Sequence, residues 1–255
     1  MRNLKLVLAY DGTDFCGWQI QPDAPSIQGT LASAIGRITS EKVLPQGSGR
    51  TDAGVHALGQ VASFQTDSVI PAANLVIALN DILPVSIRVL EADEVPEDFH
   101  ARKSAKAKTY RYRIYRGAIC PPFLAKHVWH YPYPLDFEAM RQAATVIEGE
   151  HDFTSFAAVD PEKEHYEGHE GTRRQANVRT IFSSRWRQES TEFTYEVRGN
   201  GFLHHMVRNL VGTFLLVGKG TLNTSDVSRI LQAKDRSAAG ATAPASGLYL
   251  VNVEY

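Results

Sequence analysis

The first half of the chain carries hydrophobic patterns typical of strands and helices in alternation. Leu4, Leu6 and Leu8 recur at every second position, which predicts a strand with one buried face. After it, Ser26 is a candidate N-cap for a helix whose apolar residues recur every three or four positions as far as Ile38. The predicted elements of this half are, in order, strand 4–9, helix 27–38, strands 43–46 and 59–65, helix 71–82 and strand 86–92. This β-α-β-β-α-β order is that of the ferredoxin-like arrangement.

The second half shows a similar order of elements without any repeat in sequence. Its predicted elements are strand 108–115, helix 136–147, strands 178–186 and 192–198, helix 204–217, a short extra helix 225–233 and strand 248–253. We therefore predict an α+β protein of two ferredoxin-like lobes, 1–104 and 105–255, whose antiparallel sheets join and leave a cleft between them. Residues 157–175, which are rich in acids and histidines, are predicted to form a mobile loop.

The composition is that of an ordinary globular protein. Hydrophobic residues make up 43% of the 255 residues and charged residues 22%, with no low-complexity tract. The two cysteines, Cys16 and Cys120, lie far apart without a metal-binding spacing, so neither a disulfide framework nor a zinc site is indicated. The N-terminus turns polar at Asp11, and no apolar run is long enough to span a bilayer. We therefore expect a cytoplasmic protein that is neither exported nor membrane-spanning.

Charge is balanced over the whole chain but segregated locally. The 27 Lys and Arg residues nearly equal the 28 Asp and Glu residues, so net charge alone does not predict a nucleic-acid partner. Segments 101–118 and 171–188 contain cations and no acid, and each follows an acidic stretch. Their cations are Arg102, Lys103, Lys106, Lys108, Arg111, Arg113 and Arg116 in the first segment and Arg173, Arg174, Arg179, Arg185 and Arg187 in the second. Both a scattered charged surface and a surface that faces a polyanion account for this pattern.

A glycine-rich segment between two predicted strands, GSGRTDAGVHALG at 47–59, contains a single acid, Asp52. A lone carboxylate in such a loop is usually a turn residue. Arg50, two residues earlier, favours an ionised carboxylate, and the absence of a second acid argues against an acid-pair glycosidase or a calcium loop. The segment lacks the phosphate-loop motifs, and the spacing of Asp52 and His56 does not indicate a metal site. Asp52 is therefore either a turn residue or a single nucleophile or base.

The segment KTYRYRIY alternates strictly, with Tyr110, Tyr112 and Ile114 on one face and arginines on the other. A half-buried strand with a solvated arginine face explains this alternation. Tyrosines that stack on an exposed base, beside arginines that follow phosphates, explain it as well and also account for the absence of acids.

A helix predicted near the end of the second half carries Arg208 at the edge of its apolar face. Such an arginine commonly extends to solvent, and the functional alternative is that Arg208 reaches across the cleft to a buried anion. On a helical wheel, His204 and His205 point about 100° apart, so we interpret them as polar lining and not as metal ligands.

Taken together, several segments resemble the tRNA pseudouridine synthase A family. The motifs are GRTDAGVHALGQV, DFHAR followed by KTYRYRIY, GNGFLHHMVRNLVG and the terminal GLYLV, and the resemblance runs from Tyr10 to Val253. It implies the pseudouridine synthase fold and a homodimer of two-lobed subunits that binds tRNA. It also implies the conversion of uridines 38, 39 and 40 of the anticodon stem-loop to pseudouridine, without a cofactor or a metal. Between Asp160 and Gln175 this chain is longer and more acidic than expected for the family.

The resemblance also implies roles for individual residues. Asp52 matches the catalytic aspartate, Tyr110 the tyrosine that contacts the base, and Arg208 the basic partner of the aspartate. Arg50 matches the arginine that holds the flipped-out nucleotide. Leu248, together with Leu250, is a candidate wall of the pocket in which the detached uracil rotates.

The reaction requires an everted uridine, because a nucleotide stacked in a stem cannot be attacked. Asp52 would then add to the sugar or remove a sugar proton, and Tyr110 would stack on the base and relay the C5 proton. Two alternatives remain open: a non-catalytic RNA-binding or chaperone protein in which Asp52 is a turn residue, and a nucleoside hydrolase that releases free uracil.

Overall fold

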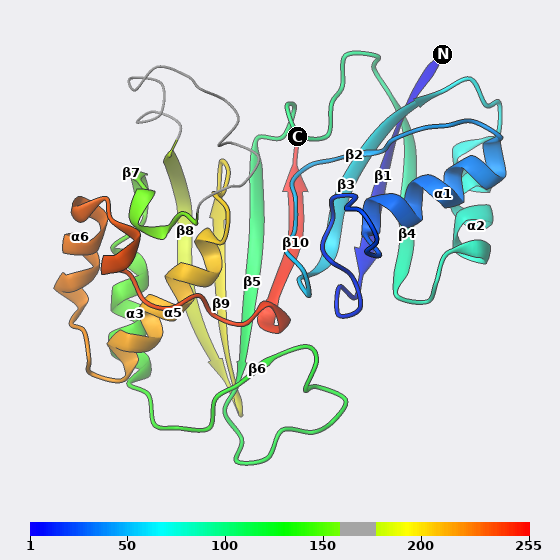
Figure 1. The fold of residues 1–255 in the computed structure, drawn as a ribbon. Coiled ribbons are helices and arrows are strands. Elements are labelled where there is room, and N and C mark those ends of the chain that lie inside the picture. The colour runs from blue at the N-terminus through cyan, green and yellow to red at the C-terminus, as the bar shows by residue number, and fades with distance from the viewer. Residues whose placement is uncertain (159–176) are drawn as a thin grey trace. The chain divides into compact units, whose positions relative to one another are not determined.

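The computed structural model describes residues 1–158 and 177–255, and their placement divides into two compact units. The N-terminal unit comprises Met1–Lys108 together with Tyr249–Tyr255, and the C-terminal unit comprises Thr109–Leu248. Within the described residues the protein is a mixed α+β structure with mostly antiparallel strands and five α-helices (Figure 1).

The N-terminal unit is a sheet in the order β4-β1-β3-β10 that carries two helices. Its elements are β1 (Arg2–Tyr10), α1 (Ile27–Thr39), β2 (Gln46–Gly47), β3 (His56–Thr66), α2 (Ala72–Ile82), β4 (Ile87–Val95) and β10 (Leu248–Glu254). Strand β1 pairs antiparallel with both β3 and β4, and the short β2 pairs antiparallel with β3. Strand β10 pairs in parallel with β3, where Tyr249 lies opposite His56.

Helix α1 forms where the sequence predicts it, and for the predicted reason. The Ser26 side chain accepts a hydrogen bond from the Gly29 N–H, which satisfies a donor that the first helical turn leaves without a partner. Ile27, Leu31 and Ile35 are fully buried on one face. Helix α2 packs against α1 and against β4, so the two helices and the sheet close the core of this unit.

The C-terminal unit is a sheet in the order β5-β9-β8-β7 with three helices. Its elements are β5 (Ala107–Tyr115), β6 (Trp129–His130), α3 (Phe137–Thr145), β7 (Gly149–Asp152), β8 (Val178–Glu189), β9 (Glu192–Gly199), α5 (Met206–Gly218) and α6 (Thr224–Ala233). Helix α3 contacts α5, α6 and β8. Nearly all of α5 is buried, and a Cβ at Gly212 would lie 1.8 Å from the carbonyl oxygen of Ala241, so only glycine permits this close approach.

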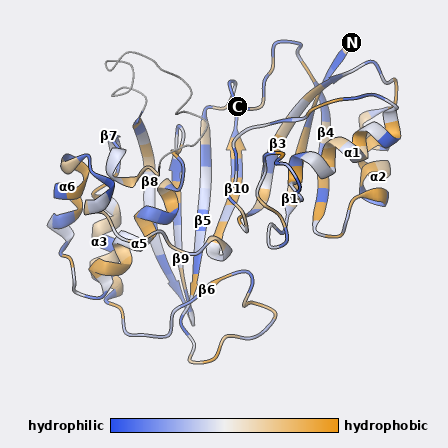
Figure 2. Cartoon of the chain, viewed as in Figure 1, coloured by the Kyte–Doolittle hydropathy of each residue, from blue (hydrophilic) through white to orange (hydrophobic). Residues whose placement is uncertain are grey.

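Hydropathy differs between strands β10 and β5. Figure 2 shows hydrophobic residues along much of β10, where Leu248, Tyr249, Leu250 and Val253 are buried. Strand β5 is mostly white to blue in the same figure, because its arginines alternate with tyrosines of intermediate hydropathy. Among the described helices, none combines the length and the apolar character that a membrane crossing requires.

The structure corrects several predicted elements. The strand predicted at 43–46 is reduced to Gln46–Gly47, since Pro45 cannot donate a ladder hydrogen bond. The helix predicted from 204 begins at Met206, because His205 has a positive φ of 58°. Strands β6 and β7 were not predicted from the sequence.

The predicted boundaries also differ from the observed units. Strand 248–253 was assigned to the second lobe, whereas Tyr249–Tyr255 groups with the N-terminal unit because β10 pairs with β3. The predicted acidic loop, from Asp160 to Gln175, lies outside the described residues.

Candidate active site

Asp52 lies in the loop between β2 and β3, residues 48–55, which we call the Asp52 loop. The Asp52 side chain is half-buried, and Arg50 on the same loop is exposed. The Val55 N–H donates to the Asp52 carbonyl oxygen at 3.1 Å, so the loop turns immediately after the aspartate. Asp52 is thus both part of a turn and partly accessible to solvent.

Two glycines in the segment that follows β1 let this segment pack directly on the Asp52 loop. A Cβ at Gly12 would lie 2.0 Å from the Val55 carbonyl oxygen, and one at Gly17 would lie 2.4 Å from the Thr51 carbonyl oxygen. Gly17 also has a φ of +95°, which an L side chain rarely adopts. The Trp18 N–H donates to the Thr51 carbonyl oxygen at 3.0 Å. The backbone on both sides of Asp52 is therefore fixed by close contact.

Beneath the loop lies a buried polar network. The Ser48 hydroxyl donates to Gln60 Oε1 at 2.6 Å, and Gln60 Nε2 donates to the Gly49 carbonyl oxygen at 2.9 Å. The Tyr10 hydroxyl lies 2.9 Å from Thr51 Oγ1 and 3.4 Å from Gln60 Nε2. All four side chains (Ser48, Gln60, Tyr10 and Thr51) are buried. Since buried polar groups are stable only when hydrogen-bonded, this network specifies one conformation of the loop.

Lys108 adds a charged contact to the start of the loop. Its Nζ donates to the Ser48 carbonyl oxygen at 2.6 Å, and a Cβ at Gly49 would lie 3.0 Å from the same nitrogen. The ammonium group therefore packs closely on Gly49, and a larger residue there would displace it.

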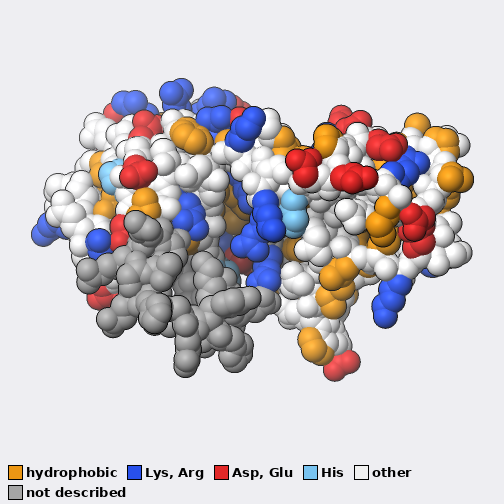
Figure 3. Space-filling view, turned by 90° about the horizontal axis from the view of Figure 1, so that it is seen from above, with side chains coloured by type: hydrophobic (Ala, Val, Ile, Leu, Met, Phe, Trp, Pro, Cys, Tyr) orange, Lys and Arg blue, Asp and Glu red, His pale blue; other side chains and the backbone are white. Residues whose placement is uncertain are grey.

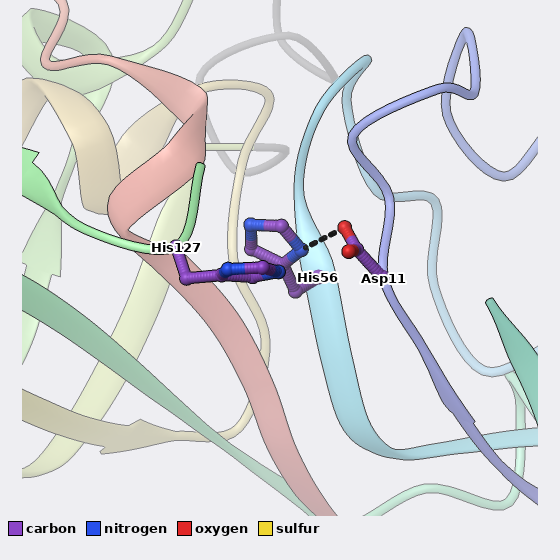
Figure 4. Close-up of side chains that lie close together, drawn as sticks. All are labelled: Asp11, His56 and His127. Atoms are coloured by element: carbon purple, nitrogen blue, oxygen red, sulfur yellow. Dashed lines mark ion pairs between the residues drawn. The ribbon is translucent and has the colours of Figure 1, made fainter. Parts of the chain in front are cut away.

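His56, at the other end of the loop, is buried and helps to hold the turn after β1 (Figure 4). Its Nδ1 accepts the Gly12 N–H at 3.1 Å in the neutral ring, and Asp11 Oδ1 lies 3.1 Å from the same nitrogen. The ring stacks on Tyr249 with centroids 4.8 Å apart. His56 thus ties the start of β3 to the Asp11–Gly12 turn and to β10.

Tyr110 lies on β5, on the buried face that the alternation predicts. Its side chain is 8% exposed, and its ring meets Phe202 edge-on with centroids 4.9 Å apart. Little of the ring is therefore open, so stacking of a base on its full face would require rearrangement.

Arg208 lies on α5 and is anchored within its own unit. Its Nε donates to the Ala243 carbonyl oxygen at 2.7 Å. Burial raises the pKa of the neighbouring Tyr112 hydroxyl, while the Arg208 charge acts in the opposite direction. The Tyr112 hydroxyl donates to the Pro244 carbonyl oxygen at 2.7 Å, and Leu248, a few residues later, is buried. Tyr112 and Arg208 therefore both hold the segment that leads into β10.

The arginines of β5 have partners on a neighbouring strand. Arg113 makes two contacts with the Glu192 carboxylate, at 2.9 and 2.7 Å, and Arg111 lies 3.1 Å from Glu196. Arg116 donates to two backbone carbonyl oxygens, those of Tyr131 and Tyr133. The acids missing from 101–118 are thus supplied by β9, and the solvated-strand interpretation explains this part of the segment.

Acidic side chains of the N-terminal unit gather on one side of it (Figure 3). On β4, Asp93 pairs with Lys5 at 2.9 Å and Glu94 with Arg2 at 3.3 Å. This acidic stretch precedes the basic segment in sequence and is partly neutralised by β1.

The two adjacent histidines differ from the prediction. Their rings do not diverge by 100°: the centroids of His204 and His205 lie 3.9 Å apart with an interplanar angle of 39°. The helical wheel does not apply to them, because His205 has a left-handed backbone and α5 starts only at Met206.

The predicted site residues are distributed over both units. Asp52 and Arg50 share a loop of the N-terminal unit, whereas Tyr110, Arg208 and Leu248 belong to the C-terminal unit. The pairing of Asp52 with Arg208 stays a prediction. Sequence reasoning overlooked Tyr10 and Gln60 under the loop. The signal that could have found Gln60 is an amide in the otherwise apolar and small stretch GQVA.

The geometry thus presents a half-buried carboxylate on a glycine-bounded loop that is held rigidly from beneath. A family model described as "tRNA pseudouridine synthase" matches residues 6–102 and 143–255, and the chain belongs to this family. It is 49% identical to tRNA pseudouridine synthase A of Solibacter usitatus (strain Ellin6076) over 255 residues, which is 100% of each chain.

Two further relatives bear the same name. The chain is 44% identical to tRNA pseudouridine synthase A of Moorella thermoacetica over 254 residues, 99% of each chain. It is also 44% identical to that of Caldicellulosiruptor saccharolyticus over 255 residues, 100% of each chain. The predicted family is therefore confirmed over the full length, and with it an isomerase that modifies tRNA.

Proposed function

We propose that this chain isomerises uridine to pseudouridine at positions 38, 39 and 40 in the anticodon stem-loop of tRNA. The observation that carries the proposal is family membership over the whole chain, together with an intact GRTDAGVH segment that holds a half-buried Asp52. The reaction breaks the N1–C1′ bond of the nucleotide and forms a C5–C1′ bond, and the uracil rotates in between.

In this proposal Asp52 is the residue that acts on the sugar. An ionised carboxylate either adds to C1′ or removes a sugar proton, and both routes free N1 for departure. Arg208 is its cationic partner, whose positive charge favours the ionised carboxylate.

The other site residues hold the nucleotide. Arg50, exposed on the Asp52 loop, is suited to contact the everted nucleotide and its phosphates. Tyr110 contacts the base and passes on the C5 proton through its hydroxyl. Leu248 provides an apolar wall for the rotating uracil. No cofactor or metal takes part in these steps.

The assembly we propose is a homodimer of two-lobed, ferredoxin-like subunits in the cytoplasm. Extrusion of the uridine costs a few kcal/mol, which contacts with the base and backbone recover. The exposed cations Arg102, Lys103 and Lys106 are candidates for the backbone contacts, since none of them lies opposite a glutamate of β9 as Arg111 and Arg113 do.

The direct test is the fate of tritium at C5 of uridine in tRNA. A pseudouridine synthase releases this tritium to water when C5 bonds to C1′, and no free base appears. Free uracil would instead identify a nucleoside hydrolase. Binding of tRNA with neither product would identify a non-catalytic RNA-binding protein and refute the proposal.

A further inference from the structure

We propose that Tyr10 and Gln60 are positioning residues for Asp52, acting through the buried hydrogen bonds that hold the residues before it. The inference rests on the proposed function and adds to it the groups that hold the carboxylate where the reaction needs it. The resemblance to the family implies no role for Tyr10 or for Gln60, although Gln60 lies within the GRTDAGVHALGQV segment.

Gln60 fixes the first part of the Asp52 loop to β3. Its Oε1 accepts from the Ser48 hydroxyl at 2.6 Å and from the Val61 N–H at 3.1 Å. Its Nε2 donates to the Gly49 carbonyl oxygen at 2.9 Å. Because the side chain is fully buried, water cannot replace any of these partners. The amide therefore holds two successive loop residues in one register.

Tyr10 extends the network to the residue next to Asp52. Its hydroxyl accepts from Gln60 Nε2 at 3.4 Å and lies 2.9 Å from Thr51 Oγ1. Burial raises the pKa of the Tyr10 hydroxyl to about 12, although the hydrogen bonds with Thr51 and Gln60 act in the opposite direction. The hydroxyl thus keeps its proton at neutral pH and is able to donate it to Thr51.

These contacts bear on catalysis because they act next to the half-buried carboxylate. Thr51 directly precedes Asp52, so a backbone that moves more freely at Thr51 would displace the Asp52 carboxylate. A displacement of about 1 Å at a reacting group can reduce a rate by about a hundredfold. Tyr10 and Gln60 are themselves buried and do not form the surface that meets RNA, so tRNA binding should not depend on them.

The test compares two substitutions that each remove one buried hydroxyl. Tyr10→Phe removes the partner of Thr51, while the Trp18 N–H still holds the Thr51 carbonyl oxygen. The matched control is Tyr195→Phe in the C-terminal unit, where the buried hydroxyl lies 2.8 Å from Ser184 Oγ. We expect kcat to fall about tenfold in Tyr10→Phe with KM for tRNA within twofold of wild type, and neither to change in Tyr195→Phe.

Three further variants separate positioning from folding. Thr51→Val should lose as much kcat as Tyr10→Phe, Thr51→Ser should restore it, and the double variant Tyr10→Phe/Thr51→Val should lose no more than either single one. Equal losses in Tyr10→Phe and Tyr195→Phe, additive losses in the double variant, or a change in KM alone would overturn the inference. Wild-type protein without tritium release would instead refute the proposed function, and an active wild type with an unaffected Tyr10→Phe would refute this inference alone.

Discussion

The Asp52 loop and strand β5 carry most of the candidate chemistry, and they are held by opposite means. Apart from the Lys108 contact at its start, the loop rests on neutral hydrogen bonds among buried side chains, those of Tyr10, Gln60 and Ser48 among them. The arginines of β5 rest on partly exposed ion pairs with β9, such as Arg113 with Glu192. Buried hydrogen bonds fix a geometry that water cannot relax, whereas exposed ion pairs contribute little and are screened by salt. The loop is therefore held in one conformation, whereas the exposed face of β5 is an ordinary sheet surface.

Among changes that leave Asp52 itself in place, the largest effect on turnover should come from forcing the neighbouring backbone away from the Asp52 loop. Gly17→Ala places a Cβ 2.4 Å from the Thr51 carbonyl oxygen, so either Gly17 or the loop must move. We expect turnover to fall by about a hundredfold or more. Gly220→Ala is the matched control, since Gly220 also has a positive φ, of 73°, but nothing lies within 4 Å of its added Cβ. Equal turnover of the two variants would show that the loop tolerates displacement.

A smaller effect concerns stability at alkaline pH. The pKa of Tyr10 is raised by burial to about 12 in the folded protein from 10.0, so folding favours the protonated hydroxyl. The stabilisation that this protonated hydroxyl contributes to the folded state is fully present below pH 10 and is lost as the pH rises through 12. When the pH rises from 9 to 11.5, the free energy of unfolding should therefore fall in both proteins, but by about 2 kcal/mol less in Tyr10→Phe than in wild type. Urea denaturation at the two pH values measures this difference, and parallel losses in the two proteins would contradict it.

The smallest effect is expected on β5. Arg113→Gln breaks a two-contact pair with Glu192 whose side chains are 26% and 23% exposed, so we expect about 1 kcal/mol or less of destabilisation in urea. Arg141→Gln, in the exposed pair with Glu138, should give no measurable change.

Salt dependence separates the two interpretations of Arg113. If its role is structural, the slope of log Kd against log salt for tRNA stays at the wild-type value in Arg113→Gln. A slope reduced by about one would show that Arg113 contacts a phosphate in the complex.

The difference between loop and strand also explains what the sequence could predict. Local signals sufficed for α1, where Ser26 caps the helix, and for the buried face of β5. They failed where distant residues decide: the acids that neutralise β5 come from β9, and the closing strand β10 pairs with β3. At His205 a single left-handed residue made the helical wheel inapplicable. The motif around Asp52 located the candidate carboxylate, whereas the side chains beneath it become visible only in three dimensions.

Asp52 is the group on which the proposed chemistry depends most. The direct measurement is a single-turnover rate of pseudouridine formation with Asp52→Asn in excess over tRNA, together with Kd for the same tRNA. Asp81→Asn, on the exposed face of α2, is the matched control. We predict that Asp52→Asn forms no detectable pseudouridine while Kd stays within a fewfold of wild type, and that Asp81→Asn behaves as wild type. A rate for Asp52→Asn close to that of wild type would reduce Asp52 to a turn residue and contradict the account.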